Sequence, residues 1–274
     1  MPADALALAL AAAVLHAGWN LGLARRHDIA AATAVAFGVS VTVFAPVGIL
    51  RWDVGADAVP YMVVSASFEL AYVALLAAAY GRAELSVVYP VARGLAPVLV
   101  LLVGVVALGV GTSSAEVAGV LLVGAGVLLV RGFARRGMTA GVGWGLLIAA
   151  CISGYTLADA RGVEHADPFA YLVVVLALPS VAYLFAIGTR GGIPRLRAEL
   201  AWTNVLVGLA SFGAFILALY ALRIGSAASV SAVSETSVVI AVALAAPLLG
   251  ERVGPRRIAG AAVVVGGVAT LALA

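Results

Sequence analysis

Arg93 stands inside the apolar run "VVYPVARGLAPVLVLL" (87–102), between Pro90 and Pro97. A charge within a membrane segment is costly, so such residues usually face the interior of a helix bundle or a water-filled cavity. Each proline removes one helical hydrogen bond, which predicts a kink and a break in this helix. Carbonyl groups freed in this way are tolerated only beside polar groups of the protein or of a cavity. Arg93 therefore predicts that this helix lines a cavity.

Glu235, in "SAVSETSVV" (231–239), falls under Arg93 when the two halves of the chain are aligned with one residue of slack. At 1.5 Å per residue, Arg93 lies about 12 Å from one membrane face and Glu235 about 13 Å from the other. The apolar core is about 30 Å thick, so the two charges can meet near its middle. They could hold the carboxylate and the ammonium group of a substrate. The alternative is a structural ion pair that locks two helices, and the two interpretations are compatible.

His16 and Asn20 are four residues apart and therefore share one face of a helix, with Trp19 beside them. They could hydrogen-bond to a substrate or stack on it. The alternative is an aromatic residue at the membrane interface together with a hydrogen bond between helices. The other candidates for substrate binding are Tyr72, Tyr89 and Ser234.

Glu69 lies near the middle of an apolar segment, with no basic residue within helical reach. A low dielectric disfavours the charged form of an isolated carboxyl group, so Glu69 is our candidate for proton coupling. The alternative is a protonated side chain that hydrogen-bonds to a neighbouring helix. A further polar group follows the apolar segment 140–160, and we interpret it as a solvated loop: Asp159, Arg161, Glu164, His165 and Asp167.

Motifs for other chemistry are missing from the sequence. It has no Walker loop, no G-x-S-x-G, no H-E-x-x-H and no dinucleotide-binding fingerprint. Cys151 is the single cysteine, which excludes an internal disulfide and a cysteine metal cluster. We therefore expect no enzymatic activity, no cofactor, no metal site and no ATP-driven transport by this chain alone.

The composition is that of a membrane protein. Of the 274 residues, 64% are hydrophobic and only 11% are charged, too few charges to cover a soluble domain of this size. A membrane-spanning helix needs about 20 mainly apolar residues. On that criterion the all-α chain has ten segments, at 3–24, 29–50, 59–80, 85–108, 115–131, 140–160, 168–188, 200–222, 226–249 and 256–273.

The arginines of the loops predict the orientation, because short cytoplasmic loops collect basic residues. Twelve arginines fall in the loops after the first, third, fifth, seventh and ninth segments, and three fall in the opposite loops. Both termini are therefore predicted to lie outside the cytoplasm.

The chain also repeats itself. "AGWNLGLAR" (17–25) lies over "SGYTLADAR" (153–161), and Gly119 and Gly126 lie over Gly260 and Gly267. We predict a first five-helix repeat at 1–131, a basic linker at 132–139 and a second five-helix repeat at 140–274. Because each repeat has an odd number of helices, the second must be inverted in the membrane. Inverted repeats are typical of transporters with a substrate site near the midplane.

Several motifs resemble the EamA-type transporters of the drug/metabolite transporter superfamily. They are "LGERVGPRRIAGAAVVVGGVATL" (249–271), with Gly250, Glu251, Arg252 and Gly260, together with "HAGWN" (16–20), "YPVARG" (89–94) and "ETS" (235–237). The resemblance covers essentially the whole chain and implies a secondary transporter of small metabolites, often an exporter of amino acids or related compounds. It also implies a basic residue before the glutamate of the ninth helix. Ser234 occupies that place here, which alters the expected charge preference.

Together these features predict a carrier, most simply an exporter, of a small polar or zwitterionic metabolite that works by alternating access. The alternative is a membrane protein that transports nothing of this kind, such as a lipid scramblase or an intramembrane enzyme. The expected partners are a small-molecule substrate and the lipid bilayer, without nucleic acid. The motifs resemble a bacterial subgroup of the family, which implies a bacterial-type cytoplasmic (inner) membrane. A monomer is the simplest assembly, with an oligomer left open.

Overall fold

The computed structural model describes residues 1–80, 82–131, 138–249 and 254–274. Within these ranges every regular element is a helix, and a single antiparallel bridge joins Val54 to Ala166. The elements in chain order are α1 (Ala3–Ala24), α2 (Ile29–Leu50), α3 (Ala58–Tyr80), α4 (Leu85–Val106), α5 (Ser114–Arg131), α6 (Met138–Gly162), α7 (Pro168–Ile187), the π-helical turn η1 (Gly188–Gly192), α8 (Ile193–Ala198), α9 (Trp202–Ile224), α10 (Ala227–Ser234), α11 (Thr236–Leu249) and α12 (Pro255–Leu273).

The helices agree with the predicted apolar segments to within a few residues at each end. Nine segments of the described chain are long and apolar enough to cross a membrane, and α10 with α11 supplies one of them, at Ala227–Leu244. The apolar part of α5, Ser114–Val130, is shorter than these nine segments. That α5 crosses the membrane as the tenth helix therefore stays a prediction. Most of the predicted basic linker lies outside the described residues, as do Gly250, Glu251 and Arg252 of the family motif.

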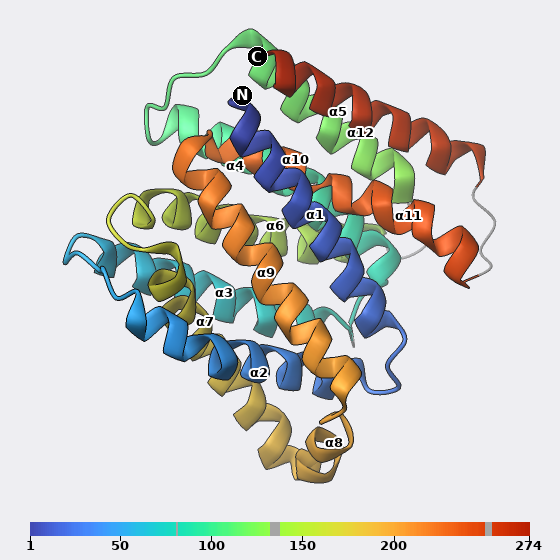
Figure 1. Ribbon diagram of the computed structural model, residues 1–274. Helices are drawn as coiled ribbons and strands as arrows, with labels where there is room; N and C mark the ends of the chain where they lie inside the picture. The colour runs from blue at the N-terminus through green and yellow to red at the C-terminus, as the bar shows by residue number, and fades with distance from the viewer. Residues whose placement is uncertain (81, 132–137, 250–253) are drawn as a thin grey trace.

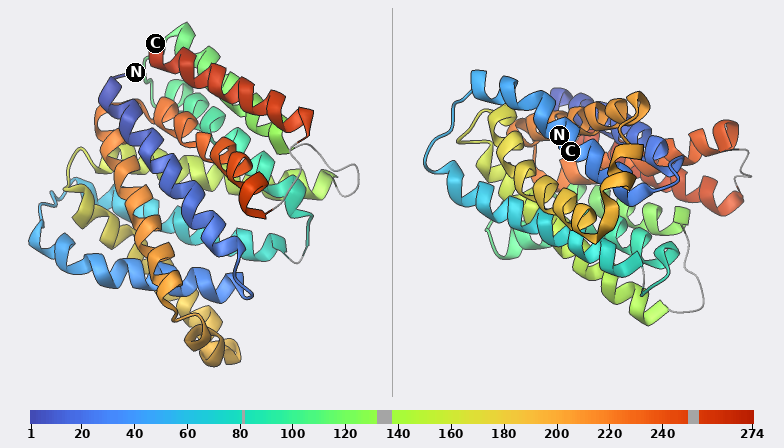
Figure 2. Two further views of the ribbon diagram at one scale, coloured as in Figure 1. Left: turned by 45° about the vertical axis from the view of Figure 1, so that its right-hand side comes forward. Right: turned by 90° about the horizontal axis from the view of Figure 1, so that it is seen from below.

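The long helices pack side by side in a single bundle (Figures 1 and 2). α5 lies against α12, α1 against α9, α2 against α7, and α6 against both α3 and α4. Both termini lie at one end of the bundle (Figure 1), where the Met1 amino group donates a hydrogen bond of 3.1 Å to the Leu271 carbonyl. α1, α4, α6, α9 and α10 together surround the centre and supply the walls of a cavity.

Glycines let α5 and α12 approach at the level of the backbone. A Cβ atom added to Gly126 would lie 2.9 Å from the carbonyl oxygen of Gly260, and one added to Gly260 would lie 2.9 Å from that of Gly126. Gly119 and Gly267 meet in the same way, at 3.0 and 2.9 Å. Small residues are favoured where helices pack inside a membrane, because the packing gain depends on close backbone contact.

We expect Gly260→Ala to destabilise the protein by about 1–3 kcal/mol, because the added methyl group would overpack a rigid contact. That methyl group would lie 2.5 Å from the backbone nitrogen of Val130. Thermal unfolding in detergent measures the effect. Gly266→Ala is the matched control on the same helix, because its methyl group would meet no atom within 4 Å. Equal melting temperatures for the two variants would contradict the proposed contact.

Candidate functional site

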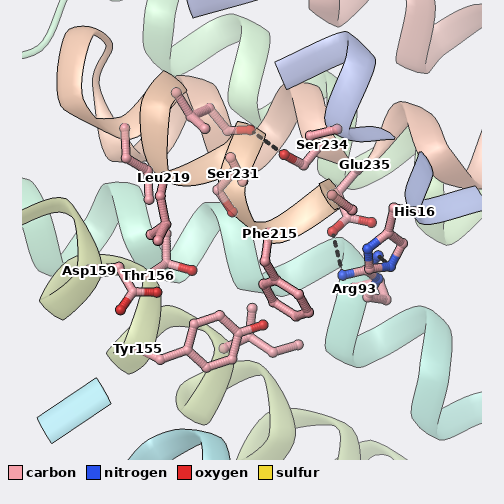
Figure 3. A pocket seen from close by; sticks show the side chains of 16 residues that line it. His16, Arg93, Tyr155, Thr156, Asp159, Phe215, Leu219, Ser231, Ser234 and Glu235 are labelled. Atoms are coloured by element: carbon pink, nitrogen blue, oxygen red, sulfur yellow. Dashed lines mark hydrogen bonds and ion pairs between the residues drawn. The ribbon is translucent and has the colours of Figure 1, made fainter. Parts of the chain in front are cut away.

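A cavity of about 90 Å³ lies at the centre of the bundle (Figure 3). A buried water needs about 10–15 Å³ of such space, so the cavity has room for several water molecules. Apolar residues of α9, including Phe215 and Leu219, form part of its wall. Its polar lining consists of His16, Arg93, Tyr155, Thr156, Asp159, Ser231, Ser234 and Glu235.

Arg93 and Glu235 form an ion pair on this cavity, with Nη1 of Arg93 3.4 Å from Oε1 of Glu235. The contact expected from the alignment of the two halves is therefore present. The side chains are only 13% and 3% exposed, so water screens the attraction between them weakly. A buried charge pair needs further hydrogen bonds to offset the loss of hydration.

His16 and Tyr89 supply further contacts to the Arg93 guanidinium. Nη2 of Arg93 donates a hydrogen bond of 2.6 Å to Nε2 of His16. Arginine can only donate, so His16 must accept with an unprotonated Nε2 and carry its proton on Nδ1. The Arg93 Cζ atom also lies 5.9 Å from the centre of the Tyr89 ring, within the range of a cation–π contact.

Two buried donors at this site have no hydrogen-bond partner among the described residues. They are Nε of Arg93 and Nε1 of Trp19. Trp19 lies behind His16, against which its ring packs edge-on with the ring centres 4.9 Å apart. An unsatisfied buried donor is costly, so a ligand that brought an acceptor to Arg93 would gain a hydrogen bond there.

A break in the ninth apolar segment positions Glu235. The segment was expected as one helix, but α10 ends at Ser234 and α11 begins at Thr236. The Ser234 hydroxyl donates to the Val230 carbonyl at 2.9 Å, and the Thr236 hydroxyl donates to the Val233 carbonyl at 2.7 Å. Hydroxyl groups bound in this way compete with the helical hydrogen bonds and often bend helices.

The break predicted in the helix of Arg93 was wrong. α4 runs from Leu85 to Val106 through Pro90 and Pro97 without interruption. A proline removes only its own N–H, so the rest of the helix can continue around it. Pro97 still leaves the Arg93 carbonyl without its helical donor, and Arg93 lines the cavity.

The remaining predicted site residues lie close behind the cavity wall. Of the eight candidates for substrate binding, Arg93, Glu235, His16 and Ser234 line the cavity, whereas Trp19, Asn20, Tyr72 and Tyr89 do not. The Asn20 amide donates to the His16 carbonyl of its own helix at 2.8 Å. Tyr72 packs edge-on against Tyr155 with ring centres 6.4 Å apart. These side chains support residues that do line the cavity.

Asp159 was expected in a solvated loop, and that interpretation was wrong. α6 continues to Gly162, so Asp159 lies within the helix, is only 9% exposed and lines the cavity. Its Oδ1 atom accepts hydrogen bonds from the Ser65 hydroxyl at 2.5 Å and from the Tyr171 hydroxyl at 3.0 Å. The exposed pair of Arg161 and Glu164 beyond it fits the expected loop.

Tyr155, Thr156 and Phe215 also line the cavity and were not singled out in the sequence. The repeat alignment contains a signal for two of them, because it places Tyr155 over Trp19 and Thr156 over Asn20. Glu69 is 5% exposed and does not line the cavity. Within the described part of the chain, no three His, Cys, Asp or Glu residues are grouped so that they could hold a metal ion.

Ion pairs join the antiparallel helices α2 and α7 at both ends of the bundle. At the end that bears the termini, Arg51 lies 3.0 Å from Asp167. At the other end, Arg195 of α8, which follows α7, donates hydrogen bonds of 2.5 and 3.0 Å to Asp28, the N-cap of α2. These hydrogen bonds hold the pKa of Asp28 below its usual value, although burial opposes the shift. The stabilisation is therefore present above the usual aspartate range and is lost as the pH falls.

The central ion pair leads to a prediction on stability. Arg93→Met would leave the Glu235 carboxylate buried without its counter-charge, a change that typically costs about 3–5 kcal/mol. Glu235→Gln would leave the Arg93 charge in the same position. We expect the double variant to lose less stability than the sum of the two single variants, as measured by thermal unfolding in detergent. Strictly additive losses would show that the pair contributes no mutual stabilisation.

Comparisons with known proteins agree with this architecture. One crystal structure, described only as that of a protein, is 20% identical, with a TM-score of 0.78 over 100% of this chain and 99% of the other, which supports the fold alone. No curated protein matches the chain. Residues 139–273 match the EamA-like transporter family. By this match the chain belongs to the EamA-like transporter family, part of the drug/metabolite transporter superfamily, and its apolar helices make it a multi-pass membrane protein.

Proposed function

We propose that the chain is a secondary carrier that moves a small polar or zwitterionic metabolite, such as an amino acid, by alternating access. The observation that carries this proposal is the Arg93–Glu235 ion pair on a cavity inside a bundle of apolar helices. Intramembrane charges that face a cavity typically mark a substrate or ion pathway. The direction that we propose is export, which is common among the transporters that the sequence resembles.

The charges of the site favour a zwitterion. A substrate carboxylate can bind Arg93, whose Nε atom has no partner among the described residues, and a substrate ammonium group can bind Glu235. Substrate then replaces one internal ion pair with two pairs of its own, so neither buried charge loses a counter-charge. Ser234 lines the cavity where a basic residue was expected, so no second cation stands beside Glu235 at that position.

The packing of the helices supports the inverted repeats. If α1 to α5 correspond in order to α6, α7, α9, α10–α11 and α12, the most extensive contacts between helices have counterparts. α3 packs against α6 as α9 packs against α1, and α4 packs against α6 as α10 and α11 pack against α1. The contact of Gly119 with Gly267 likewise becomes that of Gly260 with Gly126. Two similar halves around one central site are a common basis for alternating access.

The shape of the cavity supports access from one side in this conformation. Its lining extends from the central ion pair toward the end of the bundle where the termini lie. Asp159 lies three residues before the end of α6, Leu222 two residues before the end of α9, and Val230 three residues after the start of α10. We propose that the site opens toward that side here and toward the opposite side after the two halves rock.

For energy coupling we propose a proton, with Glu69 as its carrier. Glu69 is buried in α3 and forms no hydrogen bond or ion pair with the described residues, so a low dielectric favours its neutral form. A sodium ion would need several oxygen ligands at a helix break. The one acid at the break between α10 and α11 is Glu235, which is bound to Arg93.

Counterflow in proteoliposomes tests the proposal, with a panel of amino acids and polyamines as probes. We expect the parent to exchange at least one of them and to concentrate it when a pH gradient is imposed. Arg93→Ala and Glu235→Ala should lose binding and exchange, because each removes one charge that holds the zwitterion. Glu69→Gln should no longer respond to the gradient, because an amide cannot carry the proton.

Arg161→Ala is the matched control, because Arg161 is 45% exposed and bound to Glu164 outside the cavity. Folded Arg93 and Glu235 variants that bound the probe like the parent would refute the central site. A parent that ignored the gradient, or a Glu69→Gln variant that responded fully, would favour facilitated exchange.

The predicted orientation has its own test. From the twelve-to-three distribution of loop arginines we expect both termini outside the cytoplasm. A reporter that is active only in the cytoplasm should be silent at the C-terminus, and one that is active only outside should give a signal. The opposite pattern would reverse the orientation without affecting the internal repeat.

A further inference from the structure

Two buried carboxyl groups, Glu69 of α3 and Asp159 of α6, lie on helices that pack against each other. Glu69 is 5% exposed and Asp159 is 9% exposed. Ser65, which donates to Asp159, lies one helical turn before Glu69 on the same face of α3. That spacing corresponds to about 6 Å along the helix axis. Because Asp159 binds Ser65, one turn from Glu69, the charge of one carboxylate acts on the other across a weakly screening interior.

Among the described residues, the titratable side chains beside the two acids are those of Tyr155 and Cys151 of α6 and Tyr171 of α7, with Tyr72 of α3 next to Tyr155. None of these four side chains is a base. Arg93 of α4 is the cation on the same cavity, and it forms the ion pair with Glu235. Two like charges that lie close together in a low dielectric repel each other, so a proton bound by one group lowers the energy of the charge on the other, and the two groups titrate as one unit.

Asp159 and Glu69 differ in the hydrogen bonds that their carboxyl groups accept. Oδ1 of Asp159 accepts two hydrogen bonds, from the Ser65 and Tyr171 hydroxyls, and hydrogen bonds to a charged carboxylate favour that form. Glu69 receives no hydrogen bond from the described residues. Asp159 lines the cavity and Glu69 does not (Figure 3). The ionised member is therefore the one that cavity water can reach.

We propose that Glu69 and Asp159 form a proton-binding pair in which Glu69 holds the proton and Asp159 is the ionised group that connects it to the cavity. In the loading step a hydronium ion in the cavity gives its proton to the Asp159 carboxylate and leaves water. The proton then passes to the Glu69 carboxylate, which restores the Asp159 carboxylate, so the pair changes from two negative charges to one. Release to the cavity is the reverse. This inference rests on the proposed carrier function, for which it assigns the coupling proton a route.

Infrared spectroscopy of the full chain in lipid, without substrate, tests the pair. At neutral pH we expect the parent to show the C=O band of one protonated carboxyl group, which Glu69→Gln loses. Asp159→Asn should keep the band but slow its shift when the water is replaced by D₂O, because the connection to the cavity is removed. Glu116→Gln is the control, since Glu116 accepts hydrogen bonds from Ser226 and Ser229, away from the pair, and should leave the band and its exchange unchanged.

Glu69→Asp gives a second test if Glu69→Gln does not fold, because it should move the band without removing it. The proposal is overturned if the parent lacks the band, if Glu69→Gln retains it, or if Asp159→Asn exchanges as fast as the parent. Loss of the band on adding sodium at constant pH would assign the site to a metal cation instead. Since no substrate is present, a protein that carried no metabolite could still show the band, and a carrier driven by exchange alone could lack it.

Discussion

The cost of placing charge in an apolar bundle governs the centre of this molecule. Arg93 is tolerated there because Glu235 lies 3.4 Å away and His16 accepts one of its N–H groups. Glu235 reaches that position only because the helix around it is interrupted between α10 and α11. The hydroxyl groups of Ser234 and Thr236, which both donate to backbone carbonyls of α10, favour that interruption. A local feature of three consecutive residues thus decides where the central acid lies.

The polar side chains of the cavity wall form two separate groups, one at each end of the cavity (Figure 3). Arg93, His16 and Glu235 stand at one end, and Asp159 stands at the other, beside Thr156. Between them lie the rings of Tyr155 and Phe215. The proton site and the substrate site that we propose would therefore share one cavity without sharing a residue. Each would then respond to the charge bound at the other, because the apolar surroundings screen that charge weakly.

The sequence predicts the helices well because a membrane imposes a minimum apolar length. It also predicts the meeting of Arg93 with Glu235, since the proposed internal repeat relates the two positions. It misplaces the helix break, because two prolines are a stronger local signal than a run of hydroxyl residues. It also misjudges Asp159, because a helix end with Arg161 and Gly162 resembles a loop until Ser65 and Tyr171, which are distant in the sequence, are seen to bind it. Local sequence patterns do not predict side-chain contacts between helices that are distant in the sequence.

Two ion pairs cross between α2 and the segment that contains α7 and α8, one at each end of α2. Arg51 pairs with Asp167 at one end, and Arg195 of α8 pairs with Asp28 at the other. The arginines are 52% and 48% exposed, so water screens both pairs and each contributes little to stability. If α2 and α7 belong to opposite halves, as we propose, these pairs are links between the halves that are weak enough to break and re-form when the halves move.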